Sequence, residues 1–278
     1  MKLFKTAIVL SILIIFIFFG AQFSWLNYTS SLSKDLYTTA SKEEKFVDFK
    51  ELQNLPVPVQ KYFHLVLKDK SPIINKGYLS QEGEFKLDKD KKKYSKTQAQ
   101  QFFSTAPRGF TWHAKIFIDA GVYVNVFDSY IKQMGHVKVK FLSLYTLAEI
   151  NNNTQLTQGA LHRYLAEAIW YPTALLPSQG VEWSAIDPNT AKATLKDGNT
   201  SVSLTFSFNE KGEISSIYSP DRFREKDGSF VATPWRCRVS NYVQKGEYLI
   251  PKNGDATWIL EGNEFTYYKL NIKDVKYN

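Results

Sequence analysis

The stretch Ser201-Val-Ser-Leu-Thr-Phe-Ser-Phe208 alternates strictly between polar and apolar side chains. Successive side chains of a β-strand point to opposite faces, so this alternation predicts a strand with one buried and one solvated face. Turn residues border the stretch on both sides, at Asp197-Gly198 and at Lys211-Gly212. We therefore expect a hairpin on each side of this strand and antiparallel structure around it.

Strand-like segments recur along most of the chain, and short turns separate them. Breaks fall at Ala120-Gly121, Asp227-Gly228 and Asn253-Gly254, among others. Connections this short join neighbouring antiparallel strands. Besides 201–208, the predicted strands are 78–85, 94–103, 109–119, 122–133, 137–147, 181–186, 191–196, 213–218, 231–243, 247–251, 256–260 and 265–275.

One helical segment interrupts the strands. Apolar side chains recur at helical spacing from Leu161 to Ala168, Thr157 is the predicted N-cap, and Pro172 stops the helix. A shorter helix is predicted within 55–67. The predicted fold class is α+β: a large antiparallel β-meander, half-barrel-like, wrapped around one or two helices. No linker divides it, so we expect a single β-rich domain at 51–278.

The N-terminus is the most apolar part of the chain. Lys2 and Lys5 are followed by residues 6–33 without a charge. A transmembrane helix needs about 20 apolar residues, a length that residues 7–26 supply. We predict one N-terminal transmembrane helix, a signal anchor at 1–29, that keeps the protein in the membrane.

Charge and aromatic residues around this segment predict its orientation. The lysines before it favour a cytoplasmic N-terminus, which places the domain outside the cytoplasm, in the periplasm or on the cell surface. Trp25 and Tyr28 stand where an interfacial aromatic belt would lie. The polar stretch 30–50 is predicted to be a stalk. The alternative is a cleaved, exported form, although Gly20-Ala21 with Phe19 at the −3 position makes a poor cleavage site.

The composition argues against a nucleic-acid partner. The formal net charge is +8, but the densest lysine run, 86–96, contains Asp88 and Asp90 and follows Glu82 and Glu84. Such mixed charge is typical of a solvated hairpin tip. A weak attraction to anionic lipid headgroups is a second interpretation of the same run.

Few residues of the chain suggest catalysis or a cofactor. Cys237 is the only cysteine, which excludes an intramolecular disulfide and predicts a small buried apolar side chain. The sequence has no HExxH metal motif, no GxSxG elbow and no glycine-rich phosphate loop. We expect neither a metal nor a cofactor.

The best polar pair for a ligand lies on the predicted helix. Arg163 and Glu167 are four residues apart, between Tyr164 and Trp170. The pair is either an ordinary surface ion pair or, inside the concave sheet, a contact for a ligand headgroup, with Tyr164 on the apolar wall.

A second candidate group consists of arginines on predicted strands. Arg236 and Arg238 share one sheet face, and with Arg222 or Arg224 on a neighbouring strand they could bind a carboxylate or phosphate. The alternative is an exposed charged face paired with acidic residues such as Glu225.

The stretch Leu161-His-Arg-Tyr-Leu-Ala-Glu-Ala-Ile-Trp-Tyr-Pro-Thr-Ala-Leu-Leu-Pro177 resembles a motif of the form RYLxEaxWxPTALLP from a bacterial family of uncharacterised proteins. Supporting matches are 55–62, 106–114 and the Pro234-Trp235 strand with 246–251. The resemblance implies no activity and no catalytic residues. A meander over a helix is also similar in architecture to LolA- and LolB-type lipoprotein carriers, which does not determine function.

These observations lead to two main hypotheses. The first is a membrane-anchored extracytoplasmic protein that binds an apolar or amphiphilic, lipid-like ligand with Arg163, Tyr164, Glu167, Trp170, Arg236 and Arg238 as candidate ligand-binding residues. The second is a hydrolase in which Glu167 works with His162 or His113 as acid and base. A structural or assembly protein of the cell envelope is a third alternative.

Overall fold

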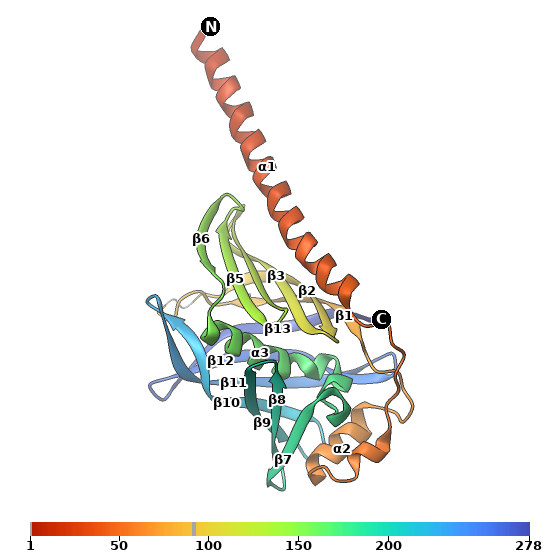
Figure 1. The fold of residues 1–278 in the computed structure, drawn as a ribbon. Helices are drawn as coiled ribbons and strands as arrows, with labels where there is room; N and C mark the ends of the chain where they lie inside the picture. The colour runs from red at the N-terminus through yellow and green to blue at the C-terminus, as the bar shows by residue number, and fades with distance from the viewer. Residues whose placement is uncertain (1, 91–92) are drawn as a thin grey trace.

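A computed structural model describes residues 2–90 and 93–278, and it confirms the predicted α+β class. The strands form an open antiparallel sheet in the order β6-β5-β4-β3-β2-β1-β13-β12-β11-β10-β9-β8-β7 (Figure 1). Strands β1 and β13 pair in the middle, so β6 and β7 lie at the two ends. The strands are β1 Lys76–Phe85, β2 Ser95–Thr105, β3 Arg108–Asp119, β4 Val122–Ile131, β5 Met134–Phe141, β6 Tyr145–Ile150, β7 Val181–Asp187, β8 Thr190–Asp197, β9 Thr200–Phe208, β10 Ile214–Lys226, β11 Ser229–Lys245, β12 Tyr248–Leu260 and β13 Asn263–Tyr277.

Helices cover both faces of this sheet. The helices are α1 Lys2–Thr39, η1 Phe49–Leu52, α2 Val57–Val66, α3 Thr154–Glu167, η2 Ala168–Trp170, η3 Pro172–Leu175 and η4 Pro177–Gln179. We call the face against α3 the inner face and the face against α1 the outer face. On β3 the two alternate as expected, because Trp112 lies under Arg163 of α3 and Thr111 bonds Ser33 of α1.

The path of α3 follows from the strand order. β6 and β7 are neighbours along the chain but lie at opposite ends of the sheet, so the segment between them must cross the inner face. Leu161 and Leu165 of α3 are fully buried there, together with Ile169 and Leu175 in the short helices that follow. The core therefore lies between α3 and the curled sheet.

Three predicted boundaries are wrong. The N-cap of α3 is Asn153, whose carboxamide oxygen accepts the Leu156 amide at 2.8 Å, and Thr157 instead accepts the Gly135 amide from inside the helix. The predicted turn at Asn253-Gly254 lies inside β12, where both residues pair with β11 and β13. The predicted strand 137–147 is two strands, because the chain turns at 142–144.

Helix α1 continues beyond the predicted anchor. It reaches Thr39 without interruption, so the first part of the predicted stalk is helical and packs on β2 and β3. Trp25 is buried against the domain, and Tyr28 contacts the ring of Phe127 on β4. These two aromatic residues therefore dock the helix on the sheet and do not form a free aromatic belt.

Candidate ligand-binding cavity

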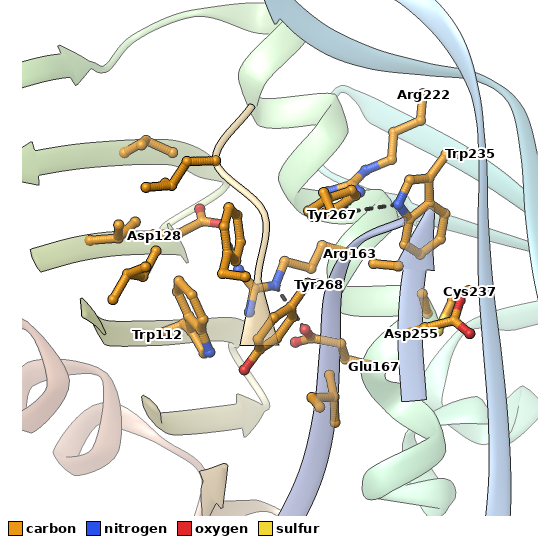
Figure 2. Close-up of a pocket in the computed structure, with 18 of the residues that line it drawn as sticks. Trp112, Asp128, Arg163, Glu167, Arg222, Trp235, Cys237, Asp255, Tyr267 and Tyr268 are labelled. Atoms are coloured by element: carbon orange, nitrogen blue, oxygen red, sulfur yellow. Dashed lines mark hydrogen bonds and ion pairs between the residues drawn. The ribbon is translucent and has the colours of Figure 1, made fainter. Parts of the chain in front are cut away.

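A cavity of about 520 Å³ lies between α3 and the inner face, with β3–β5 on one side and β10–β13 on the other (Figure 2). Its walls are mainly aliphatic and aromatic. The lining residues are Phe85, Leu87, Trp112, Ile116, Val124, Val126, Asp128, Val137, Val139, Arg163, Ala166, Glu167, Trp170, Arg222, Glu225, Trp235, Cys237, Asp255, Ala256, Tyr267, Tyr268 and Leu270.

Arg163 is the centre of a polar network in this apolar wall. Its Nε donates to Glu167 Oε1 at 2.8 Å, and its Nη1 donates to Asp128 Oδ2 at 2.6 Å. The guanidinium also lies over the rings of Phe110 and Trp112, 4.9 and 4.8 Å from their centroids. The arginine is thus enclosed by groups that favour its charged form.

The electrostatics of the network follow from this enclosure. Burial alone would lower the pKa of Arg163, but the neighbouring carboxylates of Glu167 and Asp128 outweigh burial and raise it. The arginine therefore stays charged, and two carboxylates share its one positive charge. Arg163 is saturated by acidic partners and offers little to an anionic headgroup.

Two separate sets of hydrogen bonds lie beside this network. Gln101 Nε2 donates to Glu167 Oε2 at 2.7 Å. On β1, Gln81 Oε1 accepts from the Trp112 indole at 3.0 Å and from the Tyr268 hydroxyl at 3.2 Å. These bonds hold Trp112 and Tyr268 in place, so the aromatic walls of the cavity are positioned by buried polar partners.

The second arginine of the cavity is Arg222 on β10, which lines it together with Glu225 and Asp255. Its guanidinium lies 4.6 Å from the ring centroid of Trp235 and 5.4 Å from that of Trp258. Its hydrogen bonds are long: 3.3–3.4 Å to the Gly159 carbonyl and 3.5 Å to the Tyr267 hydroxyl. Within the described residues, Arg222 has no carboxylate at ion-pair distance.

Two β-bulges bring these residues to the cavity. The β10–β11 register shifts between Ser219 and Arg222, and the β12–β13 register shifts so that Tyr267 has no partner across the strand pair. A bulge changes the direction of the side chains that follow it. Tyr267 and Tyr268 therefore both line the cavity, although adjacent residues of a regular strand face opposite ways.

The structure separates the predicted site residues into two groups. Arg163, Glu167 and Trp170 line the cavity, whereas Tyr164 is buried in the core beside it. Arg236 and Arg238 face the outer side and both pair with Glu264 on β13, not with the acidic residues expected for them. The two groups do not form one site.

Several lining residues were not predicted. Asp128, Trp112, Trp235 and Tyr268 come from strands distant in sequence from α3, and only the curled sheet brings them together. A buried arginine on α3 needs a carboxylate partner. The signal for that partner in the sequence was Asp128, an acidic residue within the apolar segment of β4.

The histidines do not support the proposed acid–base pair. His113 follows Trp112 on β3 and faces the outer side, where it lines a groove with Gln22 and Trp25 of α1. Glu167 lies on the inner side, so the two groups are on opposite sides of the sheet. His162 is buried near Arg222 and Asp221, and burial lowers its pKa to about 4, whereas Glu167 is bound by Arg163 and Gln101.

Fold and cavity together define an open antiparallel sheet protein with a helix-covered apolar cavity. The chain belongs to the Family of unknown function (DUF6920), which it matches over residues 53–277. This match confirms the resemblance to an uncharacterised family. A search of curated proteins gave no match.

Two solved structures are similar to the chain. One is a putative outer membrane lipoprotein-sorting protein domain from Vibrio parahaemolyticus, with 10% identity over 73% of this chain and 85% of that chain, at a TM-score of 0.40. The other is a LolA superfamily protein from Nitrosomonas europaea, with 12% identity over 79% of this chain and 91% of that chain, at a TM-score of 0.37.

Proposed function

We propose that this protein binds an apolar or amphiphilic, lipid-like ligand in the cavity while α1 holds it in a membrane. The cavity is the observation that carries the proposal. Its volume of about 520 Å³ falls in the range of roughly 300–1,000 Å³ of small-molecule sites. An acyl chain against its aliphatic and aromatic walls would gain about 25 cal/mol for each Å² of apolar surface removed from water.

The polar end of the ligand is assigned to Arg222. Its guanidinium has long hydrogen bonds to neutral groups only, so it can donate to a carboxylate or phosphate at the edge of the cavity. Arg163 is already bound by Asp128 and Glu167. We therefore assign the headgroup contact, first considered for Arg163, to Arg222. Arg163 then forms part of the cavity wall.

The membrane part of the proposal depends on α1. This helix is long and apolar enough to cross a membrane, and its side chains before Ala21 are almost all exposed. Beyond Gln22 the same helix packs on the domain. A helix that is both anchor and docked element would keep the cavity close to lipid, with the domain on the extracytoplasmic side.

The test uses a chain without residues 2–21, which retains the docked part of α1. Native mass spectrometry with lipid extraction reports co-purified amphiphiles, and a fluorescent fatty acid reports binding. Val126→Phe places a larger side chain in the cavity and should weaken binding of the fluorescent fatty acid by about tenfold or more, equivalent to ~1.4 kcal/mol. Val231→Phe, at an exposed position of β11, is the matched control.

Two results would contradict the proposal. One is a protein that carries no amphiphile and does not bind the fatty acid. The other is equal binding by Val126→Phe and the parent chain, with Val126→Phe still folded by circular dichroism, since a ligand in the cavity must meet that side chain.

A further inference from the structure

The turn between β5 and β6 is attached to α1. Gln22 Nε2 donates to the Leu142 carbonyl at 2.8 Å, and the Ser143 hydroxyl donates to Gln22 Oε1 at 3.2 Å. Ser143 also accepts from Asn125 Nδ2 at 2.6 Å, and both of these side chains are buried. The turn is therefore held at the level of Gln22 by hydrogen bonds to the helix.

The position of Gln22 along α1 relates the turn to the bilayer. Large exposed apolar side chains continue along the helix from Leu3 to Leu26. If the span ends at Leu26, Gln22 lies about 6 Å before that end, at a rise of 1.5 Å per residue. The β5–β6 hairpin extends from the sheet in the same general direction as α1 (Figure 1). The turn then lies in the interfacial layer of the membrane.

The side chains at this end of the sheet are apolar and exposed. Within the turn and the start of β6, Leu144 is 41% exposed, Tyr145 is 69% exposed and Leu147 is 53% exposed. Two other hairpins turn on aspartate with glycine, at Asp197-Gly198 and Asp227-Gly228, and the β4–β5 hairpin turns on the polar pair Lys132-Gln133. Polar turn residues are favoured in water. The exposed apolar side chains of the β5–β6 turn are instead favoured in apolar surroundings.

The β5–β6 turn differs from the β4–β5 turn in its side chains and not in its backbone, because Lys132 and Gln133 have nearly the same positive φ angles, 51° and 63°. Leu142 and Ser143 have φ of 52° and 62°, a region in which glycine and asparagine are usual and leucine is rare. A glycine or asparagine would relieve that conformation in water. The chain instead has the half-buried Leu142 at this position, with the exposed Leu144 two residues further on.

The free edge and exposed apolar side chains of β6 also call for a partner surface. It is an end strand of the sheet, and Leu147 sits at a bulge, unpaired between Thr146, opposite Lys140, and Ala148, opposite Val139. Exposed apolar side chains on an edge strand favour association between molecules unless something covers them. A bilayer beside α1 provides that cover.

We propose that the β5–β6 turn and the first residues of β6 insert into the headgroup region of the bilayer that α1 crosses. Tyr145 and the leucines occupy the interface, where such side chains are favoured. Lys140, without a carboxylate at ion-pair distance in the described chain, faces anionic headgroups. The domain then lies against the membrane surface. The inference rests on the anchoring part of the proposed function.

The experiment measures depth in the membrane for the full chain. The protein is reconstituted in phosphatidylcholine–phosphatidylglycerol vesicles on a Cys237→Ala background, and an environment-sensitive fluorophore is attached at a single new cysteine. Leu147→Cys reports the turn. Ile186→Cys is the matched control, because both native side chains are 53% exposed and Figure 1 places β7 far from the N-terminus. Ile14→Cys reports α1, and Tyr145→Cys repeats the turn measurement.

We expect the labels at 14, 145 and 147 to show blue-shifted emission and loss of intensity with bromine-bearing lipids, and the label at 186 to show neither. If 14 is quenched while 145 and 147 behave like 186, insertion of the turn is wrong and the anchor stands. If 14 is not quenched, the anchor itself is wrong, and the inference falls with it. None of the labelled positions lines the cavity, so neither outcome reports binding in it.

Discussion

Arg163 shows how one buried charge can organise an apolar cavity. Its guanidinium satisfies two carboxylates and lies over two aromatic rings, and its side chain is 15% exposed. Removing one partner of a buried ion network leaves the others without compensation. The residue therefore has a structural role at the cavity that differs from the headgroup role considered from its place on the helix.

Replacing this arginine tests that role. Arg163→Met should destabilise the fold by about 3–5 kcal/mol, because Asp128 and Glu167 would remain buried without a counter-charge. Urea unfolding followed by tryptophan fluorescence measures the loss. Arg238→Met, which removes an exposed pair with Glu264, should change little. Equal effects of the two variants would show that the network is not buried as described.

Arg222 is expected to discriminate between ligand ends. Arg222→Gln should weaken binding of a fluorescent fatty acid by about tenfold or more, since a charge-assisted hydrogen bond is worth roughly 1.5–3 kcal/mol. The corresponding fatty alcohol should bind the variant and the parent alike. Arg238→Gln, on the outer face, is the control. Equal losses for acid and alcohol would contradict an ionic contact at Arg222.

His162 makes stability depend on pH. Burial, together with the positive charge of Arg222, lowers its pKa from 6.5 to about 4. The unfolded chain therefore takes up a proton between these values and the folded chain does not, so stability falls as pH decreases from 6.5 towards 4. The loss amounts to about 3 kcal/mol at 1.36 kcal/mol per unit.

The check is a series of unfolding curves between pH 7.5 and pH 4.5 on the parent and on His162→Asn. The variant should lose less stability over this range than the parent, whatever its stability at neutral pH. His64→Asn, at an exposed position of α2, is the control. Identical pH slopes for the parent and His162→Asn would contradict the assignment.

At the scale of elements, α3 and the inner face of β3–β5 and β10–β13 define the cavity. The helix begins at Thr154, directly after the N-cap Asn153, and not after the predicted N-cap Thr157. Thr157 therefore lies inside the helix, where its hydroxyl accepts the Gly135 amide at 3.1 Å. This bond joins α3 to β5, one wall of the cavity. The start of the helix is therefore part of the cavity's construction.

The N-cap can be tested directly. Asn153→Ala should destabilise the protein by about 1 kcal/mol, because the Leu156 amide loses its acceptor. Thermal or urea unfolding measures the change. Asn151→Ala, in the exposed loop before the helix, should be close to neutral. If Asn151→Ala costs as much as Asn153→Ala, the capping assignment is wrong.

At the scale of the whole molecule, one continuous helix connects the apolar N-terminus to the sheet. Burial on α1 starts near Gln22 and continues through Leu36, so the domain is not joined to the apolar N-terminal segment by a free linker. Any membrane that contains the first part of α1 would lie next to the β3–β6 side of the sheet. Helix α1 and the sheet that forms the cavity are therefore joined by direct packing.

Anchoring predicts a clear behaviour in fractionation. The full chain should stay in the membrane pellet after alkaline carbonate, because about 20 apolar residues of α1 would lie in the bilayer. The chain without residues 2–21 should be released. Release of the full chain by carbonate, or a mature protein that lacks the N-terminal segment, would instead support the exported alternative.

Local pattern was sufficient for some of these features. Period two in 201–208 predicted β9, and helical spacing around Leu161 predicted α3, because both depend on neighbours along the chain. The boundary errors arose where tertiary contacts decided: Asn253-Gly254 continues a strand because β11 and β13 pair with it on both sides. Likewise, 142–144 turn without a glycine because Gln22 and Asn125 hold them.

The sequence by itself determined the α+β class, the meander and the apolar N-terminal helix, since each follows from periodicity or hydrophobicity within a short segment. Only the tertiary structure decided the cavity. Asp128 and Arg163 come from different elements, and Arg222 meets Tyr267 through two bulges that no local pattern marks. A cavity of this kind is a property of segments brought together by the curled sheet, so its residues cannot be read from any one of those segments.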